Sequence, residues 1–148
     1  MKRYEDLYKN ISTKTVDAIR TLVKVKRFYR KTETEKEMLL QELNSTLSDI
    51  YKIERPEVRF VPEIEGLLWL VAPRYNRQKM HILLRNTSIV SFLHEYKHHM
   101  QEARHKPNNE TVARGWSLSL FKQALPKLFE KSAKEGKISF VGVENHDT

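Results

Sequence analysis

The chain has 148 residues, 39% of them hydrophobic, with a formal net charge of +8 and no cysteine. This length suits one globular domain with one apolar core, because two independent domains of half the size would each be marginally stable. The lack of cysteine excludes disulfides and thiolate zinc clusters, so a bound metal would depend on histidine, carboxylate and water ligands.

The sequence predicts neither a membrane span nor a secretory signal. No stretch approaches the roughly 20 consecutive apolar residues that a membrane helix needs. The first ten residues are polar, whereas a signal peptide has an apolar central region. We therefore expect a cytoplasmic protein that does not bind a membrane.

The positive charge is concentrated in residues 1–31, which contain ten basic and three acidic side chains. Val16 and Ile19 lie there at helical spacing, which predicts a basic amphipathic helix over residues 14–30. We interpret residues 1–31 as a basic helical extension that precedes a domain over residues 32–148. Such charge is compatible with a nucleic acid or an acidic protein as partner, and equally with a solvated face that only maintains solubility.

A second helix is expected to begin after Thr32, which is followed by Glu35 at the spacing of a capping box. Leu43 and Leu47 belong to its apolar stripe, since they are one helical turn apart. Pro56 cannot continue a helix, so this one should end a few residues earlier.

The periodicity then changes to that of strands. Val58 and Phe60 alternate with a polar residue, and residues 67–72 and 80–84 form two short apolar runs. These three segments are the predicted strands. The turn-forming residues 73–76 lie between the last two, which predicts an antiparallel hairpin.

Helical spacing returns over residues 88–104, and Asn109 can cap a further helix over residues 110–125. Pro126 lacks an amide donor, so we expect a kink or a new helix there. Residues 138–143 are expected to form a short strand or a loosely ordered tail. The predicted fold class is α+β, with a first helix, a small antiparallel three-stranded sheet, a helix that carries the candidate active site, and a C-terminal helix.

Residues 94–98 read His-Glu-Tyr-Lys-His, which is an H-E-x-x-H motif on a predicted helix. His94 and His98 lie on one helical face about 6 Å apart, so that both imidazoles can bind one Zn²⁺ at roughly 2.0 to 2.1 Å. Glu95 points in a different direction, toward a water on the metal rather than toward the metal itself.

The motif alone does not distinguish a metal site from a polar helix face. Three fixed positions match by chance in a chain of this composition with a probability on the order of 2%. A helix that directs His94, His98 and Gln101 toward solvent would look the same locally. His99 is excluded as a ligand, because it lies about 140° around the helix from His94.

A zinc site of this kind needs a third protein ligand and an open position for water. Glu110 is our candidate, because helical projection places it on the same face as Ala113 and Ser117, which should face the core. A carboxylate buried there without a metal or another cation would be strongly destabilising. Two alternatives remain open: Glu110 lies exposed in the first helical turn, where it favours the helix dipole, or His105 supplies the third ligand.

With these residues the chain resembles minimal zincin metallopeptidases, and most closely the ImmA/IrrE-like group of small H-E-x-x-H peptidases. The similarity covers residues 33–130. It includes the H-E-x-x-H helix, the strand over residues 80–84 before it, and the pattern Glu110-x-x-Ala113 with bulky Trp116 on the next helix.

The resemblance implies a zinc-dependent hydrolase, a metallopeptidase that cleaves a peptide bond in a protein or peptide substrate. In such an enzyme His94, His98 and Glu110 would bind Zn²⁺, and Glu95 would act as general base on the zinc-activated water. The strand over residues 80–84 would be an edge strand to which an extended peptide adds.

Tyr75, His81 and Arg114 are candidates for stabilising the oxyanion, chosen only by proximity in the sequence. The main alternative to a hydrolase is a basic nucleic-acid-binding or regulatory module whose metal site is structural or degenerate. A metal-free helical interaction domain is a third interpretation, and bound metal would exclude it.

Overall fold

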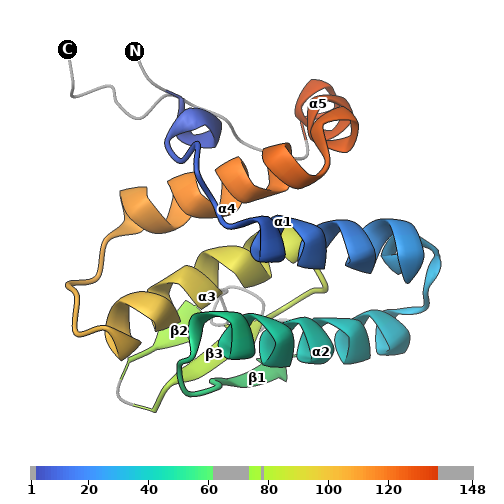
Figure 1. The fold of residues 1–148 in the computed structure, drawn as a ribbon. Helices are drawn as coiled ribbons and strands as arrows, with labels where there is room; N and C mark the ends of the chain where they lie inside the picture. Colours follow the sequence, from blue (N-terminus) through green and yellow to red (C-terminus); the bar gives the residue numbers. More distant parts are fainter. Residues whose placement is uncertain (1–2, 62–73, 78, 137–148) are drawn as a thin grey trace.

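The computed structural model describes residues 3–61, 74–77 and 79–136, and within them the fold is α+β, as predicted (Figure 1). The helices are α1 (Thr13–Arg20), α2 (Glu33–Tyr51), α3 (Ile89–Ala103), α4 (Glu110–Ala124) and α5 (Pro126–Lys134), the strands are β1 (Glu57–Phe60), β2 (Arg74–Asn76) and β3 (His81–Leu84), and three shorter helical segments are η1 (Tyr4–Asp6), η2 (Thr21–Val25) and η3 (Phe28–Arg30). Among these described elements, no helix has the length and apolar character that crossing a membrane requires.

The three strands form one mixed sheet in the order β1, β3, β2. Strand β1 runs parallel to β3, with Val58 opposite Ile82, whereas β2 runs antiparallel to β3, with Tyr75 opposite the same residue. The prediction of an antiparallel sheet is therefore only partly right. Residues 61–80 separate β1 from β3, and a connection of this length allows the chain to return and pair in parallel.

Strand β2 consists of residues that the sequence pattern assigned to a turn. Its sequence, Arg-Tyr-Asn, has no apolar alternation, but the Tyr75 hydroxyl lies 2.8 Å from Nδ1 of His99 on α3. Pairing with β3 and packing against α3 thus decide the conformation, rather than intrinsic strand propensity. The predicted strand over residues 67–72 and the expected strand or tail over residues 138–143 lie outside the described residues.

The helix boundaries follow the capping signals of the sequence. Thr32 forms the predicted capping box with Glu35 at the start of α2. The Asn109 side chain caps α4 by accepting a hydrogen bond from the Val112 amide at 3.0 Å. Pro126 is the first residue of α5. Amide groups in a first helical turn have no acceptor within the helix, so the N–H that proline lacks costs no hydrogen bond there.

The first helix is shorter than predicted. Helix α1 passes into the π-helical turn η2, and Arg27 then has a left-handed backbone with φ of 54°. This conformation ends the helical path before residue 30. Ile19 and Leu22 of this segment are buried in the same apolar core as residues of α3 and α4.

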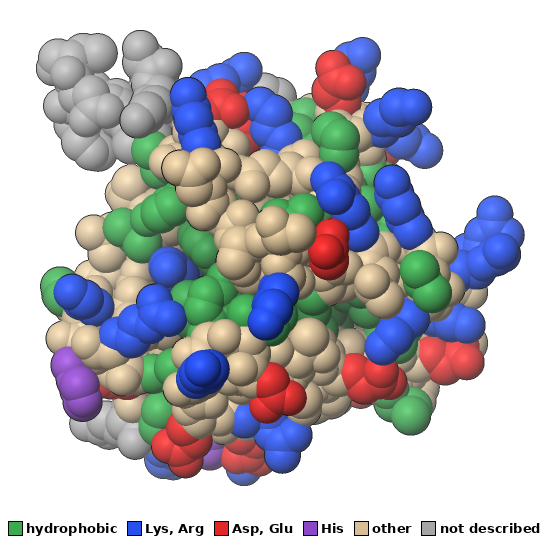
Figure 2. Space-filling view, viewed as in Figure 1, with side chains coloured by type: hydrophobic (Ala, Val, Ile, Leu, Met, Phe, Trp, Pro, Cys, Tyr) green, Lys and Arg blue, Asp and Glu red, His purple; other side chains and the backbone are tan. Residues whose placement is uncertain are grey.

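The basic segment before α2 also forms polar contacts with α4, which it crosses (Figure 1). The Tyr8 amide donates to Oγ of Ser119 at 3.1 Å, and Nε of Arg20 donates to the carbonyl of Ala124 at 3.0 Å. Figure 2 shows Lys and Arg side chains spread over the visible face, with Asp and Glu between them. Recognition of a nucleic acid or an acidic partner by this segment stays a prediction.

Helix α3 lies between the sheet and α4 (Figure 1). Its predicted apolar stripe is buried, and Phe92, Leu93 and Tyr96 have no exposed surface. The Tyr96 hydroxyl lies 2.9 Å from Oγ of Ser48 on α2. Because α4 covers the opposite side of the helix, His98 is also buried, and the interpretation in which it faces solvent is wrong.

Gly115 on α4 allows Leu7 to approach the helix. A Cβ atom at this position would overlap Cδ1 of Leu7 and lie 3.2 Å from its Cβ. We expect Gly115→Ala to lower the free energy of unfolding by about 1 to 2 kcal/mol, because the crowded side chain must move.

The control is the same substitution in a Leu7→Ala background. There it should be neutral or stabilising, since alanine is favoured over glycine in a helix by about 1 kcal/mol. Chemical denaturation of the four chains measures both effects. Stabilisation of the wild-type chain by Gly115→Ala would contradict this packing.

Candidate metal centre

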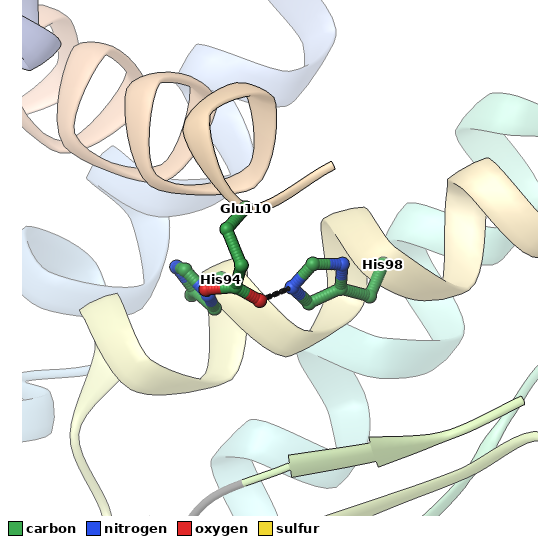
Figure 3. Close-up of side chains that lie close together, drawn as sticks. All are labelled: His94, His98 and Glu110. Carbon is green, nitrogen blue, oxygen red and sulfur yellow. Dashed lines mark hydrogen bonds and ion pairs between the residues drawn. The ribbon is translucent and has the colours of Figure 1, made fainter. Parts of the chain in front are cut away.

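The H-E-x-x-H motif lies in the middle of α3, where the helix is regular. Ser88 caps this helix by accepting a hydrogen bond from the Ser91 amide at 3.1 Å. His94 and His98 are therefore one turn apart on the same face, and their ring centroids are 5.0 Å from each other. Both imidazoles lie beneath the first turn of α4 (Figure 3).

The third member of the cluster is Glu110, the first residue of α4. Its Oε2 lies 3.1 Å from Nε2 of His94, and its Oε1 contacts Nε2 of His98 (Figure 3). One ligand atom from each of the three side chains lies within 4.8 Å of the other two. In the part of the chain that the structure describes, no other group of three histidine, aspartate or glutamate side chains is so close together.

The side-chain amide of Gln101 fixes the orientation of His98. Its Nε2 donates to the carbonyl of Asn109 at 3.1 Å, and its Oε1 accepts from the Asn109 amide at 3.2 Å. Oε1 also lies 3.0 Å from Nδ1 of His98. Because an amide oxygen only accepts, Nδ1 of His98 carries a proton, and Nε2 is the ring nitrogen that faces Glu110.

An imidazole nitrogen without its own proton and a carboxylate oxygen are both acceptors, so Nε2 of His98 and Oε1 of Glu110 cannot bond each other unaided. Nε2 of His98 is buried and has no hydrogen bond of ordinary geometry, so its contact with Glu110 requires a shared cation, either a proton or a metal ion. A tetrahedral ion with bonds of about 2.0 to 2.1 Å separates its ligand atoms by roughly 3.3 Å. The 3.1 Å between His94 and Glu110 is close to this spacing.

The ligand atoms are two imidazole nitrogens and one carboxylate oxygen. This set suits a catalytic zinc ion with a remaining position for water, and it also suits iron(II). The side chains of His94, His98 and Glu110 thus fit a divalent metal ion, while the identity of that metal is left open by the donor set.

Burial and mutual attraction determine the ionisation of the cluster. Burial lowers the pKa of His94, although the attraction of Glu110 opposes it. Burial by itself would raise the pKa of Glu110, but attraction to His94 and His98 outweighs it, and the pKa is lowered. Near neutral pH Glu110 is therefore ionised and His94 is neutral, the states in which each side chain binds a metal.

Glu95 lines the same cavity as the cluster, and only 7% of its surface is exposed. Burial raises the pKa of its carboxyl group to about 7, with a further contribution from the negative charge of Glu110. A carboxyl group with this pKa gains and loses a proton near neutral pH. This property suits a general base or acid.

The cluster opens into a cavity of about 800 Å³, lined by residues of α3, α4 and the strand β2. One part of the lining is apolar, and another is basic. The apolar residues are Ile89, Val90, Leu118 and Phe121, and the basic ones are Arg74, Arg77 and Arg114. A volume of this size accommodates a ligand of several residues or a small organic molecule.

Glu110 reaches the cluster for a different reason than predicted. The sequence argument placed it on the core face of α4, yet its side chain is 65% exposed, whereas Ala113 and Ser117 of that face are buried. Glu110 precedes the part of α4 that packs into the core, so it projects over the cavity. It is also the acidic residue of the first turn that favours the helix dipole, so the two proposed roles coincide.

The two remaining histidines of this region lie outside the cluster. His105 is exposed and has φ of 56° in the turn after α3. His99 is fully buried, with Nε2 against the carbonyl of Glu54 and Nδ1 2.8 Å from the Tyr75 hydroxyl. Since a carbonyl only accepts and burial lowers the pKa of His99, Nε2 carries the proton and the Tyr75 hydroxyl donates to Nδ1.

The three oxyanion candidates differ in position. Tyr75 lines the cavity, but its hydroxyl proton is directed to His99. His81 does not line the cavity and pairs with Glu57 at 2.8 Å. Arg114 lines the cavity one helical turn after Glu110.

The strand before the motif does not have the position that the resemblance implies. Strand β3 pairs with β1 on one side and β2 on the other, so its backbone groups are already used within the sheet. The prediction that residues 80–84 form an edge strand is therefore wrong. The strand that lines the cavity is β2.

A scan against protein-family models, a search of the curated proteins and a search of the solved structures each returned no match. The resemblance to minimal zincin metallopeptidases therefore rests on the residues of this chain alone. The cluster of His94, His98 and Glu110 is the structural observation that agrees with it.

The contacts of Gln101 predict its effect on metal affinity. Gln101→Met keeps the size of the side chain but removes the acceptor for His98, so we expect zinc affinity to fall roughly 10- to 100-fold. Gln101→Glu keeps an acceptor for the same ring and should lose less. Competition with a chromophoric chelator measures both.

The matched control is Gln41→Met on α2, whose amide donates to the carbonyl of Val58 away from the cluster. It should leave zinc affinity unchanged. Equal affinity in wild type and Gln101→Met would show that the amide does not orient His98.

Proposed function

We propose that the protein is a zinc-dependent hydrolase, and specifically a metallopeptidase. The observation that carries the proposal is the convergence of His94, His98 and Glu110, together with Glu95 in the same cavity. The donor set supports a metal, because two imidazole nitrogens and a carboxylate oxygen lie within 4.8 Å of one another.

Each residue of the centre has a distinct role in this proposal. A bound divalent cation would supply Lewis-acid polarisation of the scissile carbonyl and lower the pKa of water. His94, His98 and Glu110 would hold that cation. Glu95 accepts the proton of the attacking water at its carboxylate and donates it to the leaving amine.

The surroundings of Glu95 are suited to moving a proton in both directions. In the chain without metal, burial raises the pKa of its carboxyl group to about 7, and a cation bound at the cluster would favour the ionised form that accepts a proton. Its carboxylate is a stronger base than that of an exposed glutamate. The same group then returns the proton without a second acid.

The cavity favours a peptide over a small hydrolysable ester or amide. Its volume of about 800 Å³ and its apolar wall, which includes Ile89 and Phe121, accommodate side chains on either side of the centre. Strand β2 contributes Arg74 and Tyr75 to the lining. A strand in this place can align an extended peptide alongside the metal centre.

Two substitutions separate metal binding from catalysis. Glu95→Gln should keep one zinc per chain but lower the hydrolysis rate by roughly 10²- to 10⁴-fold, because the proton acceptor is lost. His94→Ala should lose both the metal and the activity. Elemental analysis of protein purified without a histidine tag and cleavage of an internally quenched peptide library measure the two properties.

The control is His105→Ala, since this exposed histidine lies outside the cluster. It should retain zinc and activity. Absence of any transition metal from the purified chain, with no rise in melting temperature on adding zinc, would overturn the metal proposal. Full activity in Glu95→Gln would overturn the role of Glu95.

A further inference from the structure

Arg114 on α4 places a positive charge in the cavity beside the metal centre. It lies four residues after Glu110, and therefore on the same side of the helix. Its guanidinium group lies over the ring of Tyr4, 5.5 Å from the ring centroid. This cation–π contact holds the guanidinium group beside the ring, and no carboxylate among the described residues forms an ion pair with it.

Arg74 contributes a second positive charge from a different element, the strand β2. Its side chain is exposed and lines the same cavity. It also lacks an ion-pair partner among the residues that the structure describes. Positive charge therefore reaches the cavity from both α4 and the sheet.

The remaining charges of the cavity do not neutralise these two arginines. Arg77 donates to Oε1 of Glu102 at 2.8 Å and to the carbonyl of Lys106 at 2.8 Å, so its charge is already compensated. Glu110 is bound to the two histidines of the cluster, and Glu95 is buried. A metal ion at the cluster would add further positive charge.

We infer that the cavity recognises a carboxylate group of its substrate through Arg114 and Arg74, so that the preferred peptide carries an acidic residue near the scissile bond. The inference rests on the proposed metallopeptidase function. Arginine suits this role because its planar guanidinium binds a carboxylate through two parallel hydrogen bonds. A bound carboxylate would compensate charge that the described residues leave uncompensated.

The test uses small probes that bind the metal and carry, or lack, a carboxylate. The monohydroxamates of succinic, glutaric and adipic acid have a carboxylate at three distances from the chelating group, and their primary amides are the uncharged counterparts. Affinities are measured by isothermal titration calorimetry on the zinc-loaded wild-type chain. At least one acid should bind about 10-fold or more tightly than its amide.

Three arginine variants and one control variant locate the effect. Arg114→Gln and Arg74→Gln should each reduce the ratio of the acid and amide affinities, and the double variant should bring it to about 1. Lys127→Gln removes an exposed charge on α5 that does not line the cavity, so it should leave the ratio unchanged. A ratio near 1 in the wild type at all three lengths, or a ratio unaffected by both arginine variants, overturns the inference.

Repeating the titration after a chelator has removed the metal separates failure of the metal site from failure of carboxylate recognition. A preference for the acid that depends on the two arginines and persists without metal supports carboxylate recognition, even if the chain proves not to bind zinc. Strong zinc binding with equal affinities for acid and amide overturns carboxylate recognition and leaves the metallopeptidase proposal intact. Two peptides, one with Glu and an amidated end and one with Gln and a free end, distinguish a side-chain carboxylate from a terminal one.

Discussion

The packing of α4 over the histidine face of α3 determines the geometry of the candidate centre. Gln101 links the two helices at the cluster, because its side-chain amide is hydrogen-bonded both to the backbone of Asn109 and to the ring of His98. The residue after Asn109 is Glu110, so the same contact that selects the tautomer of His98 also sets the position of the carboxylate. The motif supplies two imidazoles on one turn, but the packing of α4 against α3 adds Glu110 and completes a cluster that could hold a metal ion.

His98 and His99 are adjacent on α3, and hydrogen bonds hold their rings on different sides of the helix. His98 faces α4 and donates from Nδ1 to Gln101, whereas His99 faces the sheet side and donates from Nε2 to the carbonyl of Glu54. Each tautomer follows from an acceptor that cannot donate. Because His99 also accepts from the Tyr75 hydroxyl, it connects α3 to the strand that lines the cavity. The position of that strand relative to the metal centre is therefore fixed by a buried polar contact.

Local rules allowed the sequence to predict the helices and the members of the cluster. Caps such as Thr32 and Asn109 act within one turn, and the spacing of His94 and His98 is a property of any α-helix. The errors concern contacts between distant segments. The parallel pairing of β1 with β3, the three-residue strand β2 and the exposure of Glu110 depend on tertiary packing, which periodicity does not encode. The contacts of Gln101 and His99 were missed for the same reason, although their place beside the motif was a signal.

Lys97 on α3 lies against aromatic rings of both α4 and the N-terminal segment. Its ammonium group lies 5.3 Å from the ring centroid of Trp116 and 6.0 Å from that of Tyr8. Burial lowers the pKa of Lys97 to about 8, with a contribution from the charge of Arg104, so the aromatic faces partly replace lost hydration. Tyr8 also bonds Ser119 on α4, and thus one residue of the segment contacts both helices that supply the ligands. Tyr8 therefore contacts both helices that carry the cluster, although it lies more than 80 positions before them in the sequence.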